Sequence, residues 1–239
     1  MLQHRSQEKE LLDLGADHYT TKEYEHCMRM LFRVNKIFGY FYSTVKILKS
    51  LPKKLTLLDI GCGGGLFLLH LSQYFPYMQF KGIDISTEAI HLANKDLQTW
   101  KKSHEINNVT FQLQDQSNLA LVENSVDVVL TTLVCHHLSD DELIDFLQNM
   151  LKASRIMVII HDLHRHSIAQ WLFACLSPLL FRNRLITHDG LISIRRGFIR
   201  SEWQTLLKKA GIPHYQLKWC FPFRWRVLLC KNGDYLKGM

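Results

Sequence analysis

Apolar residues recur at steps of three and four over residues 8–51, which predicts two or three helices at the start of the chain. From residue 55 onward the pattern changes to short apolar runs separated by helical stretches. These runs, each predicted to be a strand, are residues 55–60, 79–85, 109–113, 126–130 and 155–160. Strands that alternate with helices are typical of βαβ units, so we expect a parallel sheet with helices on both faces.

The alternation breaks after the fifth run. Residues 168–181 are mostly apolar, and several arginines follow them. A helix is predicted over 201–210, and two further strands are predicted near 214–219 and 224–230. The segment between the fifth strand and residue 201 is therefore expected to be a helical insertion.

The whole pattern predicts a Rossmann-like, doubly wound α/β fold with a seven-stranded sheet whose last strand is antiparallel. A helical lid is expected over residues 1–51, followed by one α/β domain over 52–239 with its helical insertion at about 164–197. The composition agrees, because 239 residues with 47% hydrophobic and 21% charged side chains are typical of a globular protein with a sizeable core.

The charge is unevenly distributed. The net charge is +7, and residues 151–239 carry 15 Lys and Arg against 4 Asp and Glu.

Six scattered cysteines without a C-x-x-C pair predict reduced thiols rather than a zinc knuckle or a disulfide framework. No signal-peptide pattern and no run of about 18 apolar residues is found in the sequence, so we expect a cytoplasmic protein.

A glycine-rich motif follows the first strand. Asp59, Gly61, Gly63 and Gly65 form D-x-G-x-G-x-G between a strand and a helix. Asp84 lies 19 residues beyond Gly65 at the end of the next strand, where a carboxylate can accept both ribose hydroxyls of a nucleoside. The loop lacks the G-x-G-x-x-G spacing of dinucleotide sites and the Lys-Ser/Thr of a P-loop, which disfavours NAD, ATP and GTP.

The segment LLDIGCGGG together with Asp84 resembles the first motifs of the class I S-adenosylmethionine-dependent methyltransferases, over residues 55–160. VDVVLTTLVCHHL, residues 126–138, is similar to a segment of their ubiquinone and menaquinone C-methyltransferase-like (type 11/25) subgroup. The resemblance implies S-adenosylmethionine (SAM) as cofactor and S-adenosylhomocysteine (SAH) as product. The cofactor contacts that it implies are Asp59, Gly61, Cys62, Gly63, Gly65, Asp84, Ile85, Asp115, Gln116 and Thr132.

Three histidines follow the fourth and fifth strands, at the edge where ligands bind in doubly wound folds. We nominate His136 and His161 as catalytic bases for a phenol or enol acceptor, and His137 as a substrate contact. The alternative is that each is a packed or capping histidine. The run from His161 to His166 also has metal-ligand spacing, but methyl transfer requires no metal, and we expect none.

The apolar insertion predicts a hydrophobic substrate pocket or a helix at a membrane surface, with core packing as the alternative. Trp171 and Arg195 are nominated as substrate contacts. The segments HDGLISIRRGF and FPFRW resemble a bacterial methyltransferase subgroup of polyketide or quinone metabolism. We therefore expect methyl transfer to an oxygen or carbon of a hydrophobic small molecule that is phenolic, quinone or polyketide-like, with peripheral membrane contact as a further possibility.

Two alternatives remain open at this point. The first is an RNA methyltransferase, because the basic, aromatic stretch KWCFPFRWRVLLCK, residues 218–231, has the residue types of a single-stranded RNA platform, although a half-buried hairpin has the same pattern. The other alternative is a non-catalytic methyltransferase-fold module that binds a ligand or docks on a membrane. The resemblance disfavours DNA as a partner, because TTLV stands where base N-methyltransferases carry N/D-P-P-Y/F.

Overall fold

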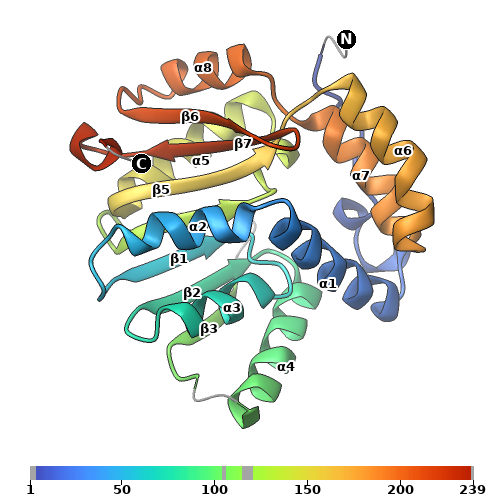
Figure 1. The fold of residues 1–239 in the computed structure, drawn as a ribbon, viewed down its shortest axis with the longest axis horizontal. Helices are drawn as coiled ribbons and strands as arrows, with labels where there is room; N and C mark the ends of the chain where they lie inside the picture. The colour runs from blue at the N-terminus through green and yellow to red at the C-terminus, as the bar shows by residue number, and fades with distance from the viewer. Residues whose placement is uncertain (1–3, 104–105, 115–120, 238–239) are drawn as a thin grey trace.

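A computed structural model describes residues 4–103, 106–114 and 121–237 of the chain (Figure 1). Its seven strands form one sheet in the order β3-β2-β1-β4-β5-β7-β6. The strands are β1 (Thr56–Ile60), β2 (Gln79–Asp84), β3 (Val109–Leu113), β4 (Val126–Thr132), β5 (Ser154–Leu163), β6 (Tyr215–Cys220) and β7 (Arg224–Leu229). Strands β1 to β5 pair in parallel, and β7 pairs antiparallel with both β5 and β6. The predicted doubly wound sheet is confirmed.

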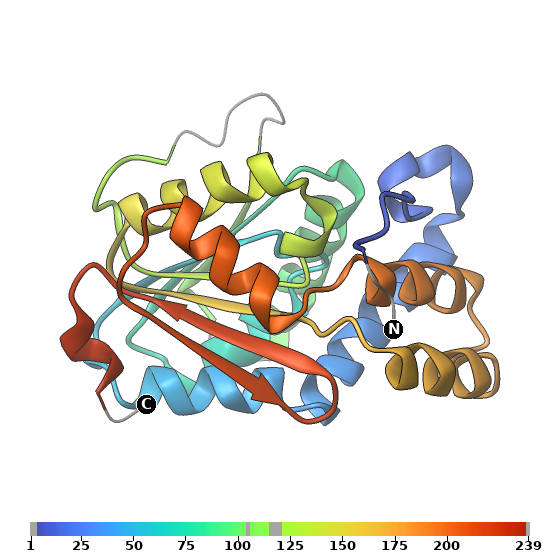
Figure 2. The ribbon, with the colours of Figure 1, turned by 90° about the horizontal axis from the view of Figure 1, so that it is seen from above.

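Helices cover both faces of this sheet (Figure 2). The helices are α1 (Thr21–Ile37), α2 (Tyr40–Lys49), α3 (Leu66–Tyr74), α4 (Thr87–Ser103), α5 (Asp140–Ala153), α6 (Ser167–Phe181), α7 (Arg184–Arg196) and α8 (Arg200–Lys209). Side chains of α2, α3 and α4 share one core with the sheet, and side chains of α5 and α8 share the other. Helices α1, α6 and α7 lie beyond the end of the sheet, together with the N-terminal segment.

Two of the helix starts are visible in the sequence because each carries a capping box. At the start of α1, the Thr20 side chain accepts a hydrogen bond from the Glu23 backbone N–H, and the Glu23 carboxylate accepts one from the Thr20 backbone N–H. Ser139 and Glu142 do the same at the start of α5. At the other end of α1, Gly39 adopts a left-handed conformation with φ 86°, which turns the chain into α2.

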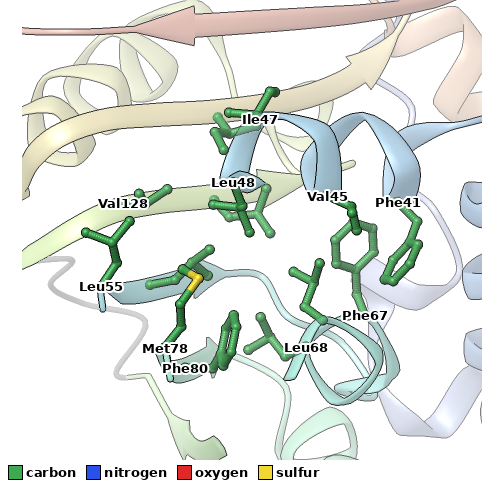
Figure 3. Close-up of a cluster of buried hydrophobic side chains, with 14 of the residues drawn as sticks. Phe41, Val45, Ile47, Leu48, Leu55, Phe67, Leu68, Met78, Phe80 and Val128 are labelled. Atoms are coloured by element: carbon green, nitrogen blue, oxygen red, sulfur yellow. The ribbon is translucent and has the colours of Figure 1, made fainter. Parts of the chain in front are cut away.

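Helix α2 belongs to the core of the α/β domain. Its Phe41 and Leu48 are fully or almost fully buried, and they pack with Phe67 and Leu68 of α3 against the sheet (Figure 3). The helical lid expected over residues 1–51 is therefore divided: α2 is a layer of the domain, and only α1 and the segment before it lie over the end of the sheet. The apolar periodicity predicted the helices, but it did not show which surface each would cover.

The segment between β5 and α8 forms the helical pair α6 and α7, which lies within the range expected for the insertion. Helix α7 packs on α1, where Cys27 contacts Leu185 and Ile186. Among the residues that the structure describes, no helix is long and apolar enough to cross a membrane.

The basic, aromatic stretch near the end of the chain is the β6–β7 hairpin. All six residues of β7 are buried, and these include Arg224, Trp225 and Arg226. Arg224 lies over the ring of Tyr40 at 4.3 Å, and Trp225 donates a hydrogen bond to the Phe198 carbonyl. The two arginines of the stretch are therefore buried and do not face solvent, where an RNA platform would need them, whereas Trp219 and Phe221 are 40% and 80% exposed.

Candidate functional site

A cavity of about 1360 Å³ lies between the ends of β1, β2 and β4 and the helices α1, α6 and α7. Pockets for a single ligand usually measure about 300–1,000 Å³, so this volume suffices for a cofactor and a second molecule. One wall of the cavity is formed by the glycine loop and by polar groups at the strand ends. The opposite wall is formed largely by apolar side chains of α1 and α6.

The glycine loop, residues 61–65, joins β1 to α3 and forms part of the polar wall of the cavity. Gly61 has φ 74°, and a Cβ built on it would lie 2.3 Å from Cγ2 of Val134, so only glycine fits there. Gly63 has φ 53°, and the only atom within 4 Å of a Cβ built on it is Sδ of Met28, at 3.4 Å. The loop therefore presents a bare backbone to the cavity at Gly63, where a ligand can approach closely.

Asp84 ends β2 and fastens this loop. Its Oδ2 accepts a hydrogen bond from the Gly63 backbone at 2.8 Å, and its Oδ1 accepts one from the Ser86 backbone at 2.9 Å. Burial raises the pKa of Asp84, although these backbone amides act in the opposite direction. Asp84 and its exposed neighbour Ile85 both line the cavity. Each carboxylate oxygen keeps a second lone pair with which it can accept a ligand hydroxyl.

Two buried oxygen atoms in the same wall have no hydrogen-bond partner in the described part of the chain. They are Oδ1 of Asp59 and Oγ1 of Thr132, and both residues line the cavity. Burial, with a contribution from Asp84, raises the pKa of Asp59 well above its usual range. Because a buried polar atom without a partner is costly, this wall is suited to a ligand that brings hydrogen-bond donors, such as an ammonium group.

Of the remaining residues implied by the resemblance, Cys62 and Gly65 are described by the structure and two others are not. Cys62 is buried in the loop and lines the cavity, and Gly65 begins α3. Asp115 and Gln116 lie outside the described residues. The positions that the structure describes therefore line one cavity, at the ends of β1, β2 and β4.

A cluster of histidines and carboxylates lies at the sheet edge beside this wall. His136 Nδ1 is 2.7 Å from Oδ1 of Asp162, and its Nε2 is 3.5 Å from Oε1 of Glu10. Burial lowers the pKa of His136, but Asp162 and Glu10 outweigh burial and raise this pKa to about 9. His137 Nδ1 is 2.9 Å from Oδ1 of Asp13. Both histidines line the cavity.

Three nominated residues lie outside the cavity lining. His161 is fully buried, its Nε2 is 2.9 Å from Oγ1 of Thr44, and its ring packs on Tyr40. Trp171 is 64% exposed on the outer side of α6. Arg195 points to Glu8 at 3.1 Å, while the next residue, Arg196, lines the cavity.

Sequence reasoning missed three residues of this site. Arg196 donates to the carbonyl of His136 and pairs with Asp13, and Glu10 approaches the ring of His136. Glu10 and Asp13 are separated from the histidines by more than 120 residues and stand in no motif. Of the three, only Arg196 could have been found from the sequence, because it directly follows the nominated Arg195 and helical periodicity distinguishes the faces of neighbouring residues.

The comparisons with known proteins agree with this geometry. Residues 57–155 match the family model of a methyltransferase domain. An uncharacterized methyltransferase of Schizosaccharomyces pombe is 32% identical over 96 residues, which are 39% of this chain and 34% of that protein. The chain spans between 23% and 38% of the length of the curated relatives that it matches.

Solved structures show the same fold. Human N-acetylserotonin methyltransferase in complex with SAM superposes with a TM-score of 0.62 at 15% identity, over 89% of this chain and 57% of that one. A plantazolicin methyltransferase in complex with a monoazolic desmethylPZN analog and SAH gives 0.61 at 20% identity, over 86% and 90%. Residues 57–155 thus match a methyltransferase-domain model, and the fold is shared with methyltransferases whose structures contain SAM or SAH.

The burial of His161 has a consequence for acid stability. Burial, together with Arg226 and Arg224, lowers the pKa of His161 to about 3 from its ordinary value of 6.5. Below pH 6.5 the unfolded chain therefore binds a proton that the folded chain does not, and stability is lost as the pH falls toward 3. We expect this residue to contribute a loss of about 2 kcal/mol in the free energy of unfolding between pH 7 and pH 5.

Urea unfolding of the wild type and of His161→Gln at both pH values tests this expectation. The variant should lose about 2 kcal/mol less than the wild type on acidification, whereas His188→Gln, at a half-exposed position, should behave like the wild type. Equal losses in wild type and His161→Gln would contradict a neutral, buried His161.

Proposed function

We propose that this protein transfers a methyl group from SAM to an oxygen or carbon atom of a hydrophobic small molecule. The observation that carries the proposal is that the glycine loop, Asp59 and Asp84 open into the same cavity as an apolar wall. Cofactor and acceptor can therefore be held side by side, which is the main requirement of a direct methyl transfer.

The polar wall supplies the cofactor contacts in this proposal. Asp84, already oriented by two backbone amides, would accept the ribose hydroxyls, and the bare backbone at Gly63 would allow the ligand to lie close. The unpartnered oxygens of Asp59 and Thr132 would accept hydrogen bonds from the methionine end. When bound, SAM supplies an electrophilic methyl group on its sulfonium.

The apolar wall favours a hydrophobic acceptor. It consists of side chains from three helices, among them Met28, Leu31, Phe38, Leu172, Phe173, Leu176 and Ile186. Such a wall excludes water from the reacting groups and orders an apolar molecule without charged contacts. Phenolic, quinone or polyketide-like compounds fit this description, and the human structural neighbour is named for a small aromatic acceptor.

The histidine pair borders both walls. His137 is the more accessible of the two, with 28% of its side chain exposed against 2% for His136. We propose that His137 contacts the acceptor. His136 is paired on both ring nitrogens and would act by holding the strand-end turn, Cys135–His137, in place.

The cofactor assignment is tested by thermal unfolding with SAH. At about 100 times its dissociation constant, SAH should stabilise the protein by about 2.7 kcal/mol, or roughly 5–11 °C for a chain of this size. Asp84→Asn, which removes the charge and one acceptor oxygen, should lose most of this shift, whereas Asp145→Asn on the exposed side of α5 should keep it. An undiminished shift in Asp84→Asn would refute its role.

The acceptor wall is tested on helix α6 with two leucines, of which only one lines the cavity. Leu176 lines the cavity, whereas Leu179 is 77% exposed and does not. Leu176→Gln should lower kcat/KM for an alkylphenol acceptor by roughly 10-fold or more, because it places a polar group where a buried methylene chain is expected. Leu179→Gln should leave it unchanged, and both should keep the SAH shift. Equal kcat/KM values for the two variants would count against an acceptor beneath α6.

The outer face of α6 supports a second proposal, contact with a membrane in which a hydrophobic acceptor would reside. Ile168 and Trp171 are more than half exposed there, and Arg182 follows the helix. Wild-type protein should co-sediment with anionic lipid vesicles, and Ile168→Ser/Trp171→Ser should reduce the bound fraction several-fold. Tyr77→Ser, a similarly exposed site between α3 and β2, is the control. Equal sedimentation of all three proteins would rule out this face.

A further inference from the structure

One group of side chains with metal-binding atoms stands beside the proposed cofactor wall. Oε1 of Glu10 and Nε2 of His136 and His137 belong to side chains whose ligand atoms all lie within 4.8 Å of one another. Glu10 comes from the N-terminal segment, and the histidines come from the turn after β4. It is the only such group of three among the described residues. The run from His161 to His166 does not converge, because His161 contacts Thr44 and His164 contacts Trp219.

The hydrogen bonds of the His136 and His137 rings determine which ring nitrogen of each can bind a metal ion. Each Nδ1 faces a carboxylate oxygen: Asp162 at 2.7 Å from His136, and Asp13 at 2.9 Å from His137. A carboxylate only accepts, so the ring proton of a neutral imidazole lies on Nδ1 in both cases. Each Nε2 then points to the carboxylate of Glu10 and is the ring nitrogen that a metal ion would bind in place of a proton. A metal ion at this position would join the three side chains through the same atoms that now face one another.

The distances agree with a metal ion in this position. Oε1 of Glu10 is 3.5 Å from Nε2 of His136 and 3.9 Å from Nε2 of His137. Two ligands of a tetrahedral zinc ion, each about 2.0–2.2 Å from the metal, lie about 3.3 Å apart. Small side-chain rotations are enough to close this difference.

The surroundings of the three groups are those of a supported metal site. A histidine ligand usually donates its other ring N–H to a carboxylate, which fixes its tautomer and orientation, and both rings do so here. The carboxylate of Glu10 is held in turn, since Ser193 Oγ donates to its Oε1 at 2.7 Å.

We propose that Glu10, His136 and His137 bind one divalent transition-metal ion, with zinc as the ion of reference, and leave one coordination position open to the cavity. Two imidazole nitrogens and one carboxylate oxygen suit zinc and its neighbours in the first transition row far better than Mg²⁺. This site departs from the metal-free expectation raised by the sequence. If the acceptor of the proposed methyl transfer is a hydroxyl group, its oxygen would bind the metal at the open position, and the metal would lower the pKa of that hydroxyl. This role of the metal rests on the proposed function.

Metal binding is tested on the purified full chain after treatment with a chelator. Zn²⁺ affinity is measured by competition with a chromogenic chelator, and Co²⁺ is used as a spectroscopic probe, since a low-coordinate Co²⁺ site absorbs strongly in the visible. We expect one Zn²⁺ per chain, and we expect Co²⁺ loaded into the metal-free protein to be displaced by Zn²⁺ but not by Mg²⁺. His137→Gln, which removes a ligand at a partly exposed position, should weaken Zn²⁺ binding at least 100-fold and abolish the Co²⁺ absorption.

Asp13→Asn provides a test that leaves all three ligands in place. It should weaken Zn²⁺ binding by about 10- to 100-fold, because Asp13 orients the His137 ring. The control is His91→Gln, whose histidine is exposed on α4 and does not line the cavity; it should bind as the wild type does. Absence of saturable Zn²⁺ binding in the wild type, or equal binding by wild type, His137→Gln and Asp13→Asn, would overturn the proposal.

The SAH thermal shift, measured on the same samples, separates this proposal from the proposed function. A preserved SAH shift without Zn²⁺ binding overturns the metal site alone. Zn²⁺ binding that depends on His137 and Asp13, without any SAH shift, supports the metal site and overturns the cofactor assignment instead.

Discussion

The site depends on one constraint, which is that the strands of a parallel sheet all end at the same edge. Asp59, Asp84, Thr132 and Asp162 each stand at or near the carboxyl end of a different strand, and the sheet order brings β2, β1, β4 and β5 side by side. Asp59, Asp84 and Thr132 thus line one cavity, and the fully buried Asp162 holds His136 at its border. Loops can leave this edge without closing it, because the helices return the chain to the opposite edge.

The N-terminal segment borders the cavity through polar contacts as well as through the apolar packing of Leu11 and Leu12. Arg5 donates to the carbonyl of Leu138 at 2.7 Å, and Glu10 reaches the ring of His136. Arg196 of α7 bonds both to this segment and to the turn after β4, so three distant parts of the chain meet there. Buried charges of this kind add little to the free energy of unfolding, but they fix the relative positions of the three segments, because each buried charge needs a specific partner. The same demand makes the region suited to a cation.

The two apolar helices α2, near the start of the chain, and α6, in the insertion, bury different amounts of their apolar surface. Helix α2 buries its apolar side against the sheet, where Phe41 has no exposed surface, and so it stabilises the domain. Helix α6 instead faces the cavity with one side and leaves Trp171 and Leu179 exposed on the other. An apolar helix that no core requires is available to a hydrophobic ligand or surface, which connects the acceptor wall and the membrane contact proposed above.

The sequence by itself determined the fold class, the strand and helix segments and the polar wall, because strand periodicity, capping residues such as Thr20 and Ser139, and the Asp59-to-Asp84 spacing are local patterns. Tertiary structure decided which helices cover the core, that β7 buries Arg224 and Arg226, and that His161 lies away from the cavity. It also brought Glu10 and Asp13 to the histidine pair. No local pattern records these contacts, because they join segments more than a hundred residues apart, and only packing of the whole chain sets the distance between them.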